Sequence, residues 1–347
     1  MEAPIRVLMI TSEWPTQEIP FAVPFLVQQV EFLKRAGVEV EVFYFRGAKN
    51  PINYFKAWRR LQRQYKYRWN EFDLVHAQFG QAALIPWPKR LPLVITFHGV
   101  DMLGYLSHTG RMTLQGKLLV WLGQMVAHFA DAVLIVSNEM RRNLPASIPL
   151  HMLPTGVDLA SMPCLTREEA RRQLGLSLDE RLILFVGNPN DPRKRSSRAR
   201  EAVDVLNSRL PARLIIGWGK PHKDIIALMY ACDVLVVTSL QEGSPTIVKE
   251  ALACNLGVVS VVVGDVVERL KDIDGCEVVA DDKPETIAAA LERALRHDGR
   301  IRGREAVEEL DERVLTEKLI RIYQSIIGRS KPAIKMQDHS LASSRSR

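Results

Sequence analysis

Two glutamates in the stretch QEGSPTIVKEAL, Glu242 and Glu250, are the first candidates for chemistry in this sequence. Seven residues separate them and include a Gly-Ser-Pro (243–245) that is typical of a helix start. Two carboxylates can form an acid–base pair, or each can bind hydroxyl groups at a different part of one ligand. Spacing does not decide between these, because three other pairs share it: Glu31 and Glu39, Glu277 and Glu285, and Glu309 and Glu317.

The surrounding residues predict a strand over 233–239 (DVLVVTS), followed by a loop and a helix. In 243–245 the glycine permits a tight turn, the serine is a good N-cap, and the proline suits the first helical position. The N-terminus of a helix favours an anion, since its N–H groups are unpaired and it carries about half a positive charge. Glu242 then falls in the loop and Glu250 about a turn and a half into the helix, so we expect them to flank a ligand. A solvated helix start is the alternative.

Short apolar, β-branched runs alternate with helix-period segments along the chain, which predicts parallel sheets covered on both faces. The runs form two series that meet near residues 160–180, where Pro163 precedes a helix-start pattern at Thr166. The fold class is therefore α/β with two doubly wound domains, whose ligands are expected at the carboxyl ends of the strands. The predicted strands are 5–11, 38–45, 73–77, 93–97, 132–136, 182–187, 213–217, 233–239 and 257–263.

Length and composition agree with this class. The 347 residues exceed the usual size of one core, and 47% hydrophobic with 25% charged residues is ordinary for a globular protein. The four cysteines lack metal-ligand spacing, which disfavours a disulfide framework or zinc site and favours a reducing cytoplasm. No signal-peptide pattern is apparent, and no apolar run reaches the roughly 20 residues that span a bilayer.

The net charge of +7 favours phosphate-bearing partners. Residues 51–70 contain six Lys/Arg, no acid and six aromatic residues. They are interpreted first as a solvated helix with buried aromatic stems, then as a contact with an anionic membrane face, and last as a single-stranded nucleic-acid site. Because nothing else supports nucleic acid, membrane contact is favoured over it.

The segment TSLQEGSPTIVKEALACNLGVVSVVVGDVVERL (238–270) resembles the donor-site signature of retaining, nucleotide-sugar-dependent glycosyltransferases of family four, which have the GT-B fold. The resemblance covers roughly residues 4–328. Other segments in family order are LVITFHGVDMLG (93–104), ADAVLIVSNEMRRNL (130–144), HMLPTGVDLASM (151–162), LILFVGNPNDPRKR (182–195) and PHKDIIALMYACDVLVVTS (221–239).

This resemblance implies roles for the residues of the motif. Glu250 matches the glutamate that binds the ribose hydroxyls, and a carboxylate can accept two hydrogen bonds from a vicinal diol. Glu242 matches the glutamate that reaches the donor sugar. The pyrophosphate would lie on the helix start between them, formed by Gly243, Ser244, Pro245 and Thr246, of which Pro245 has no N–H to donate.

The family supplies cations for the departing diphosphate just after the first strand of the second domain, in a Gly-Arg and then a Lys-Gly. This sequence has Gly187-Asn188 and then Arg193-Lys194-Arg195. The resemblance assigns the phosphate role to Lys194, with Arg193 as second choice. Asn188 stands where the family has arginine, so the second positive charge has no matching residue.

In the first domain, His98 and Asp101 lie in FHGVD at the end of a predicted strand. A lone histidine there is usually structural, but His98 matches the histidine that contacts the donor sugar from across the cleft. Asp101 is placed on the acceptor side, with capping of the next helix as its alternative. The first loop (11–29) lacks the family's Gly-Gly pair and has Ile-Pro-Phe-Ala at 19–22.

The resemblance implies an acceptor-side domain over 1–163, a nucleotide-sugar-binding domain over 164–309 and a helix over 310–329 that crosses back to the first domain. The polar, basic and serine-rich composition of residues 330–347 predicts a disordered tail. No metal or other cofactor is expected, and Asp272-Ile273-Asp274 is interpreted as a turn.

The function implied is retaining transfer of a hexose from a UDP- or GDP-sugar to a glycan or lipid-linked acceptor in polysaccharide or glycolipid synthesis. His98, Glu242 and Lys194 are the expected catalytic residues. The expected location is cytoplasmic, at the inner membrane face. The alternatives are a nucleotide-sugar 2-epimerase and a non-catalytic partner protein on the same fold, the latter favoured by Asn188 and the missing glycine pair.

Overall fold

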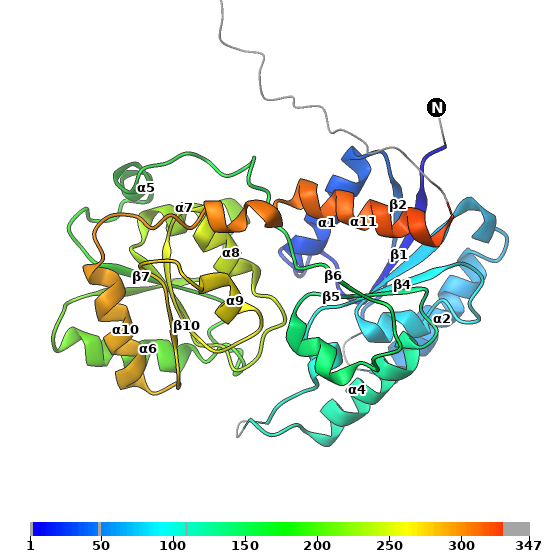
Figure 1. Ribbon diagram of the computed structural model, residues 1–347, viewed down its shortest axis with the longest axis horizontal. Coiled ribbons are helices and arrows are strands. Elements are labelled where there is room, and N and C mark those ends of the chain that lie inside the picture. The colour runs from blue at the N-terminus through cyan, green and yellow to red at the C-terminus, as the bar shows by residue number, and fades with distance from the viewer. Residues whose placement is uncertain (1–2, 48–49, 108–109, 329–347) are drawn as a thin grey trace, which may run out of the picture.

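The computed structural model describes residues 3–47, 50–107 and 110–328, which form two α/β domains, each built on a parallel sheet (Figure 1). The first sheet has the strand order β2-β1-β3-β4-β5-β6. Its strands are β1 Arg6–Thr11, β2 Glu39–Tyr44, β3 Leu74–Gln78, β4 Leu93–Phe97, β5 Ala132–Ile135 and β6 Leu150–Met152.

The second sheet has the order β11-β10-β9-β7-β8. Its strands are β7 Leu182–Val186, β8 Arg213–Gly217, β9 Val234–Val237, β10 Gly257–Val261 and β11 Glu277–Val279. All nine predicted strands are confirmed. The two strands that were missed, β6 and β11, have three residues each, too few to show an apolar run.

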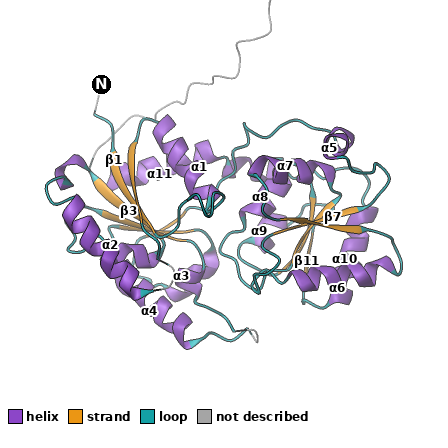
Figure 2. Ribbon diagram, turned by 180° about the vertical axis from the view of Figure 1, so that it is seen from behind, coloured by secondary structure: helices purple, strands orange, loops and turns teal. Residues whose placement is uncertain are grey.

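Helices cover both faces of each sheet (Figure 2), so the central strands β3, β4 and β9 are buried along their whole length. The helices of the first domain are α1 Pro24–Arg35, α2 Pro51–Gln64, α3 Val100–Leu103 and α4 Leu114–Ala127. Those that follow are α5 Arg167–Leu174, α6 Ser196–Asn207, α7 His222–Ala231, α8 Thr246–Ala253, α9 Val266–Leu270, α10 Pro284–Arg296 and α11 Glu312–Ile326.

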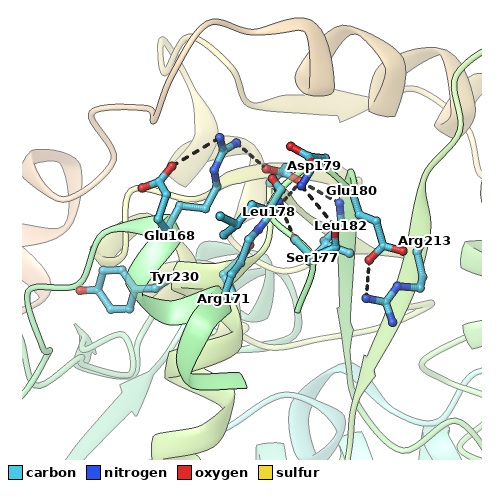
Figure 3. A network of polar contacts seen from close by, with 12 residues as sticks. Glu168, Arg171, Ser177, Leu178, Asp179, Glu180, Leu182, Arg213 and Tyr230 are labelled. Atoms are coloured by element: carbon cyan, nitrogen blue, oxygen red, sulfur yellow. Dashed lines mark hydrogen bonds and ion pairs between the residues drawn. The ribbon is translucent and has the colours of Figure 1, made fainter. Parts of the chain in front are cut away.

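Helix α5 opens the second domain and is tied to its sheet by a buried arginine (Figure 3). Thr166 and Glu169 form a capping box at the predicted helix start. Arg171 donates hydrogen bonds to the carbonyl oxygens of Ala231 (2.8 Å) and Leu178 (2.6 Å), and to a carboxylate oxygen of Asp233 (2.8 Å). These partners compensate the desolvation of the guanidinium, so the charge fixes α5 in place.

The chain crosses between the domains twice, and the two crossings are bonded to each other. The Val157 N–H donates to the Leu310 carbonyl (3.0 Å), and the Glu312 N–H donates to the Val157 carbonyl (3.0 Å). The predicted boundary at 163/164 falls in the first crossing, between β6 and α5. The second crossing leads into α11.

Helix α11 lies against α1 of the first domain (Figure 1). Its buried side chains Leu315, Leu319 and Tyr323 share an apolar cluster with Leu26 and Leu33 of α1. The helix predicted over 310–329 is therefore present and packs on the first domain, beginning at Glu312. The tail predicted over 330–347 lies outside the described residues.

Candidate functional site

The loops after β4 and β9, one from each domain, meet at the carboxyl ends of their strands. A Cβ atom on Gly243 would lie 2.0 Å from the carbonyl oxygen of His98. A Cβ atom on Gly99, whose φ is +148°, would lie 3.2 Å from the Gly243 nitrogen. Only glycine permits this approach of backbone to backbone, so the predicted residues His98 and Gly243 are brought together.

Lys194 and Glu242 form an ion pair next to this contact. The Lys194 Nζ donates to Glu242 Oε1 at 2.5 Å, and both side chains are partly exposed. Gly187, at the end of β7, has a φ of +150°, and a Cβ atom there would lie 3.3 Å from Lys194 Cγ. The missing side chain at 187 therefore leaves space for the lysine stem. An ammonium and a carboxylate are thus held together at the edge of the second sheet.

Glu250 is paired with a residue that the sequence did not single out. His222, the first residue of α7, places its Nε2 2.7 Å from Glu250 Oε1. This hydrogen bond to Glu250 raises the pKa of His222 above its ordinary value. Glu250 is the fifth residue of α8 and Glu242 precedes the helix. This confirms the prediction that Glu242 lies in the loop and Glu250 about a turn and a half into the helix.

The prediction that Ser244 is the N-cap of this helix, with Pro245 as its first residue, is wrong. Helix α8 begins at Thr246 and has Pro245 as N-cap, with no side-chain capping bond. The Ser244 hydroxyl is instead engaged by two buried charges: it donates to Asp265 Oδ2 (2.8 Å) and accepts from Lys249 Nζ. Those charged partners outcompete a backbone N–H for the hydroxyl.

Lys249 fastens the start of α8 to the connection between the domains. Its Nζ donates to Thr155 at both the carbonyl (3.1 Å) and Oγ1 (2.9 Å), and the Thr246 hydroxyl donates to the same Oγ1 (3.2 Å). Burial lowers the pKa of Lys249 to about 8, although the charge of Asp265 opposes that shift. The backbone on which the phosphates are predicted to lie is therefore rigidly supported.

The remaining cations after β7 are already engaged. Arg193 binds both carboxylate oxygens of Asp191 (3.1 and 2.7 Å), and Arg195 donates to the Thr238 carbonyl and to Asp282. Asn188 accepts a hydrogen bond from the N–H two residues on, so its side chain closes a turn. Lys194 is thus the cation of this loop that points to the glutamate of the motif.

His98 lies between two aromatic rings, Phe25 at 5.1 Å and Phe79 at 4.7 Å between ring centroids. Burial lowers its pKa to about 3, so the ring is neutral near pH 7. Its Nε2 is 2.7 Å from Gln78 Oε1, while the amide nitrogen of Gln78 donates to Gln29. The Gln78 oxygen therefore accepts from a protonated Nε2, and Nδ1, which is buried and has no partner among the described residues, keeps its lone pair.

Asp101 is buried, and its carboxylate accepts backbone N–H bonds from Gly80 (3.1 Å), His98 (3.1 Å) and Gly99 (2.9 Å). Burial raises its pKa to about 6, even though these bonds favour the charged form. The carboxylate is fully used in holding the loop that carries His98. This geometry favours a positioning role for Asp101 over contact with an acceptor.

The first loop reaches helix α1 without the family's glycine pair. Val23, just before α1, takes the left-handed conformation with φ 41° and ψ 55°. A β-branched residue rarely adopts this conformation, which is ordinary for glycine. The first loop thus enters α1 through a valine in a strained conformation.

No group of three or more His, Cys, Asp or Glu side chains suited to hold a metal ion occurs within 3–47, 50–107 and 110–328. Asp272 has a φ of 61° and Asp274 accepts from the Gly275 N–H, which is the turn predicted for this Asp-x-Asp. In the same ranges, no helix is long and apolar enough to cross a bilayer.

Three residues of the site were missed from the sequence: His222, Lys249 and Gln78. Gln78 is the last residue of β3, and His222 follows the loop after β8. Both therefore lie near the carboxyl ends of strands, where ligands of such sheets bind, and this position could have identified them. Lys249 carried no such signal, because a lysine in an amphipathic helix ordinarily points to solvent.

Two family models match adjoining parts of the chain. The model for Glycosyltransferase Family 4 matches residues 3–161, and that for Glycosyl transferases group 1 matches residues 181–297. TuaC of Bacillus subtilis (strain 168), named as a teichuronic acid biosynthesis glycosyltransferase, is 28% identical over 265 residues, covering 68% of this chain and 66% of TuaC. The D-inositol 3-phosphate glycosyltransferase of Mycobacterium tuberculosis (strain CDC 1551 / Oshkosh) is 25% identical over 275 residues, 67% of this chain and 56% of that protein. The chain thus spans less than two thirds of the length of these curated relatives.

Solved structures share the two-domain arrangement. Sucrose-phosphate synthase from Thermosynechococcus elongatus superposes with a TM-score of 0.72 at 18% identity, over 93% of this chain and 99% of that chain. HepE of Anabaena in complex with UDP-glucose gives 0.60 at 17% identity, over 93% and 98%. At these identities the likeness shows the fold. Together with the two family models, it establishes that this chain belongs to the family-four glycosyltransferases of the GT-B fold.

Proposed function

We propose that this protein is a retaining glycosyltransferase that moves a sugar from a nucleotide-sugar donor to a glycan or lipid-linked acceptor. One observation carries the proposal: the Lys194–Glu242 and His222–Glu250 pairs flank the start of α8, and the His98 loop faces that start from the other domain. The solved relative with UDP-glucose, and a trehalose-6-phosphate structure from E. coli with UDP-2-fluoro glucose, favour UDP over GDP as the donor nucleotide.

In this proposal the ribose diol binds Glu250, whose carboxylate can accept from both hydroxyls. Glu250 is buried and its partner His222 is partly exposed, so the imidazole has to move off the carboxylate when the nucleotide enters. The diphosphate then lies along Gly243–Thr246. There it meets backbone N–H groups and the positive end of the helix.

Lys194 provides the charge that the leaving diphosphate requires. Its ammonium is held by Glu242 at 2.5 Å, so it is positioned before the donor arrives. As the bond from the sugar to the phosphate breaks, negative charge grows on the phosphate oxygens and positive charge on the anomeric carbon. Lys194 stabilises the first and the Glu242 carboxylate the second, which is electrostatic catalysis by preorganised groups.

His98 serves to orient the donor sugar. Because Nε2–H is committed to Gln78, Nδ1 is the ring atom left to accept a hydrogen bond from a sugar hydroxyl. Nδ1 is buried in this structure, so the loop that carries His98 has to move when the donor binds. The acceptor hydroxyl attacks the anomeric carbon from the face that the diphosphate leaves, and its proton passes to the departing phosphate oxygen. Attack by Glu242 with a glycosyl-enzyme intermediate is the alternative retaining route.

A thermal-shift panel of UDP-, GDP- and ADP-sugars tests donor binding. We expect one nucleotide to raise the melting temperature, and Glu250→Ala to remove that rise. Glu285→Ala, on the first turn of α10 in the same domain, is the matched control and should keep it. A donor shift that persists in Glu250→Ala would remove this residue from the site.

Turnover with the donor found in this panel tests the reaction. We expect donor consumption to depend on an acceptor and to give an α- or β-linkage matching that of the donor. Consumption without an acceptor, with change at the sugar's C2, would identify an epimerase. Donor binding with no turnover under any acceptor would identify a non-catalytic partner.

A further inference from the structure

Helix α4 is mostly apolar, with Gln115, Lys117 and Gln124 as its polar side chains, yet only one side of it packs on the protein. Its packed side is formed by small and branched residues that include Gly116, Val120 and Gly123. On the other side Leu114 is 83% exposed, and Leu118 and Trp121 are each 56% exposed. These three recur at spacings of four and three, so they form one stripe. A continuous stripe of large apolar side chains on a helix is normally buried against another surface, so this stripe indicates an apolar partner.

The stripe continues into a groove of about 470 Å³ on the same domain. Met125 and Phe129, the next residues at the same spacing, line the groove together with Trp58 of α2 and Trp87. Phe55 of α2 is exposed and stacks on Trp58 with ring centroids 5.7 Å apart. One apolar surface therefore runs from Leu114 to α2. We call it the α2–α4 face: Phe55, Trp58, Trp87, Leu114, Leu118, Trp121, Met125 and Phe129.

Six members of this face are among the large apolar residues that are exposed in the described part of the chain: Phe55, Trp87, Leu114, Leu118, Trp121 and Phe129. Nine of the fifteen large apolar residues that are exposed in the described part of the chain fall within residues 51–130. That segment is less than a quarter of the sequence. Scattered exposed apolar residues are ordinary, whereas a contiguous patch marks an interaction site.

The same segment carries the whole net charge of the protein. Residues 51–130 contain ten Lys/Arg and three Asp/Glu, a net +7, which equals the net charge of all 347 residues. The three acids are engaged: Asp101 with backbone N–H groups, Glu71 with Arg68, and Asp73 with Arg6. Three cations of α2, Lys56, Arg59 and Arg63, are exposed and form no ion pair with any residue that the structure describes. The surroundings of the α2–α4 face are thus positive.

We propose that the α2–α4 face docks on the surface of an anionic phospholipid bilayer. A bilayer presents a layer of phosphate charge directly over hydrocarbon, which is the combination that this face complements. Trp121 and Trp87 suit the interfacial depth, where an aromatic ring with one polar edge is most favourable. A second copy of this chain does not fit, because the exposed cations beside the face, Lys56, Arg59 and Arg63, would repel those of the other copy.

Docking in this way would bring the transfer site near the membrane, a consequence that rests on the proposed function. The α4 stripe begins at Leu114, and Gly116 of the same turn lies against Gly104 and Tyr105. The Gly104 carbonyl accepts a hydrogen bond from Gln241 Nε2 (2.9 Å), next to Glu242. A lipid-linked acceptor held in the bilayer therefore has a short path to the donor sugar. Bilayer binding itself requires no transferase activity, so the two proposals can fail separately.

Flotation of the full chain with phospholipid vesicles tests the docking. We expect binding to vesicles of phosphatidylcholine with phosphatidylglycerol, weaker binding at high salt, and little binding to phosphatidylcholine alone. Leu118→Ser/Trp121→Ser should weaken binding at least tenfold. The matched control is Leu178→Ser/Trp218→Ser, a leucine and a tryptophan of the second domain that are 43% and 56% exposed, and it should bind like the wild type.

The charge contribution is tested by Lys56→Gln/Arg59→Gln/Arg63→Gln. Each basic residue near an anionic surface strengthens binding about fivefold, so this variant should bind roughly a hundredfold more weakly. The proposal is overturned if the wild type does not bind anionic vesicles at low salt, or if the control variant loses binding equally. It is also overturned if sedimentation shows a dimer that Leu118→Ser/Trp121→Ser dissociates, since the face would then be covered by a second copy.

Discussion

Lys194 is the side chain whose removal tests the proposed chemistry most directly. Lys194→Ala deletes the ammonium that pairs with Glu242, and it should lower kcat by about 10²–10³, as expected for loss of a preorganised electrostatic group. Initial rates at saturating donor measure this. Lys271→Ala, an exposed lysine of the same domain, should retain the wild-type rate. If Lys194→Ala is fully active while Arg193→Ala is not, the phosphate role belongs to Arg193.

The His222–Glu250 pair predicts a pH-dependent contribution to stability. The pKa of His222 is raised in the folded state, so the folded protein binds the proton more tightly than the unfolded chain does. The resulting stabilisation is fully present below the ordinary histidine pKa and disappears as pH rises through the folded value. His222→Gln should therefore lower the melting temperature at pH 5.5 and leave it nearly unchanged at pH 8.5. A loss of equal size at both pH values would contradict the charged pair.

Sequence alone located the ends of this site but not its interior. The strand–glycine–helix pattern placed Glu242 and Glu250 correctly, because turn and helix geometry are local. It failed for Ser244, whose hydroxyl is taken by Asp265 from 21 residues further along the chain. It also missed His222, since nothing local shows that the start of α7 lies beside the second turn of α8.

The loop that carries His98 and the loop that carries Gly243 can lie in contact because residue 243 has no side chain. Gly243→Ala would place a methyl group 2.0 Å from the His98 carbonyl oxygen, so the loops must separate. We expect a loss of stability of about 1–3 kcal/mol and a fall in kcat/KM of at least tenfold. Chemical denaturation and steady-state rates measure the two effects. Gly217→Ala, whose Cβ would lie 3.2 Å from side-chain atoms that can move, should be tolerated better; equal damage would show that the contact at Gly243 is not special.

Among the elements, the strands were predictable because a strand that is buried on both faces consists of a nearly continuous run of apolar residues. The same logic did not reveal the α2–α4 face. LLVWLGQMVA in α4 has the composition of a buried helix, and only the fold shows that the face carrying Leu118 and Trp121 is left uncovered. The composition of a helix therefore predicts that its apolar side chains will be buried. Only the topology shows whether another part of the same protein covers them.

The two domains are joined by a small buried cluster of charged groups at the crossings. Glu312, the first residue of α11, is 3% exposed and bonds through its N–H to Val157, while its carboxylate lies against Gly156. Lys249 reaches Thr155 from the second domain. Sequence order predicted that α11 would cross back, but the packing of ionisable groups between the crossings depends on the assembled molecule. The cohesion of the domains should therefore respond to pH.

Burial raises the pKa of Glu312 to about 8, so the folded protein holds a proton on this carboxyl that the unfolded chain releases near its ordinary value of 4.5. Between pH 5 and 8 the folded state binds more protons, and the free energy of unfolding falls as pH rises. Glu312→Gln removes this titration while keeping the shape of the side chain. Relative to the wild type, the variant should be nearly neutral at pH 5 and more stable by about 1–3 kcal/mol at pH 8. Urea unfolding at both pH values measures the difference. The pKa of Lys249 is lowered to about 8, so the titration of this lysine changes the stability mainly above pH 8 and affects the wild type and the variant alike. The control is Glu305→Gln, at an exposed glutamate that precedes α11, and its stability relative to the wild type should not change with pH. If Glu312→Gln is less stable than the wild type at pH 8, the carboxylate of Glu312 is ionised and stabilises the junction, which would contradict the prediction.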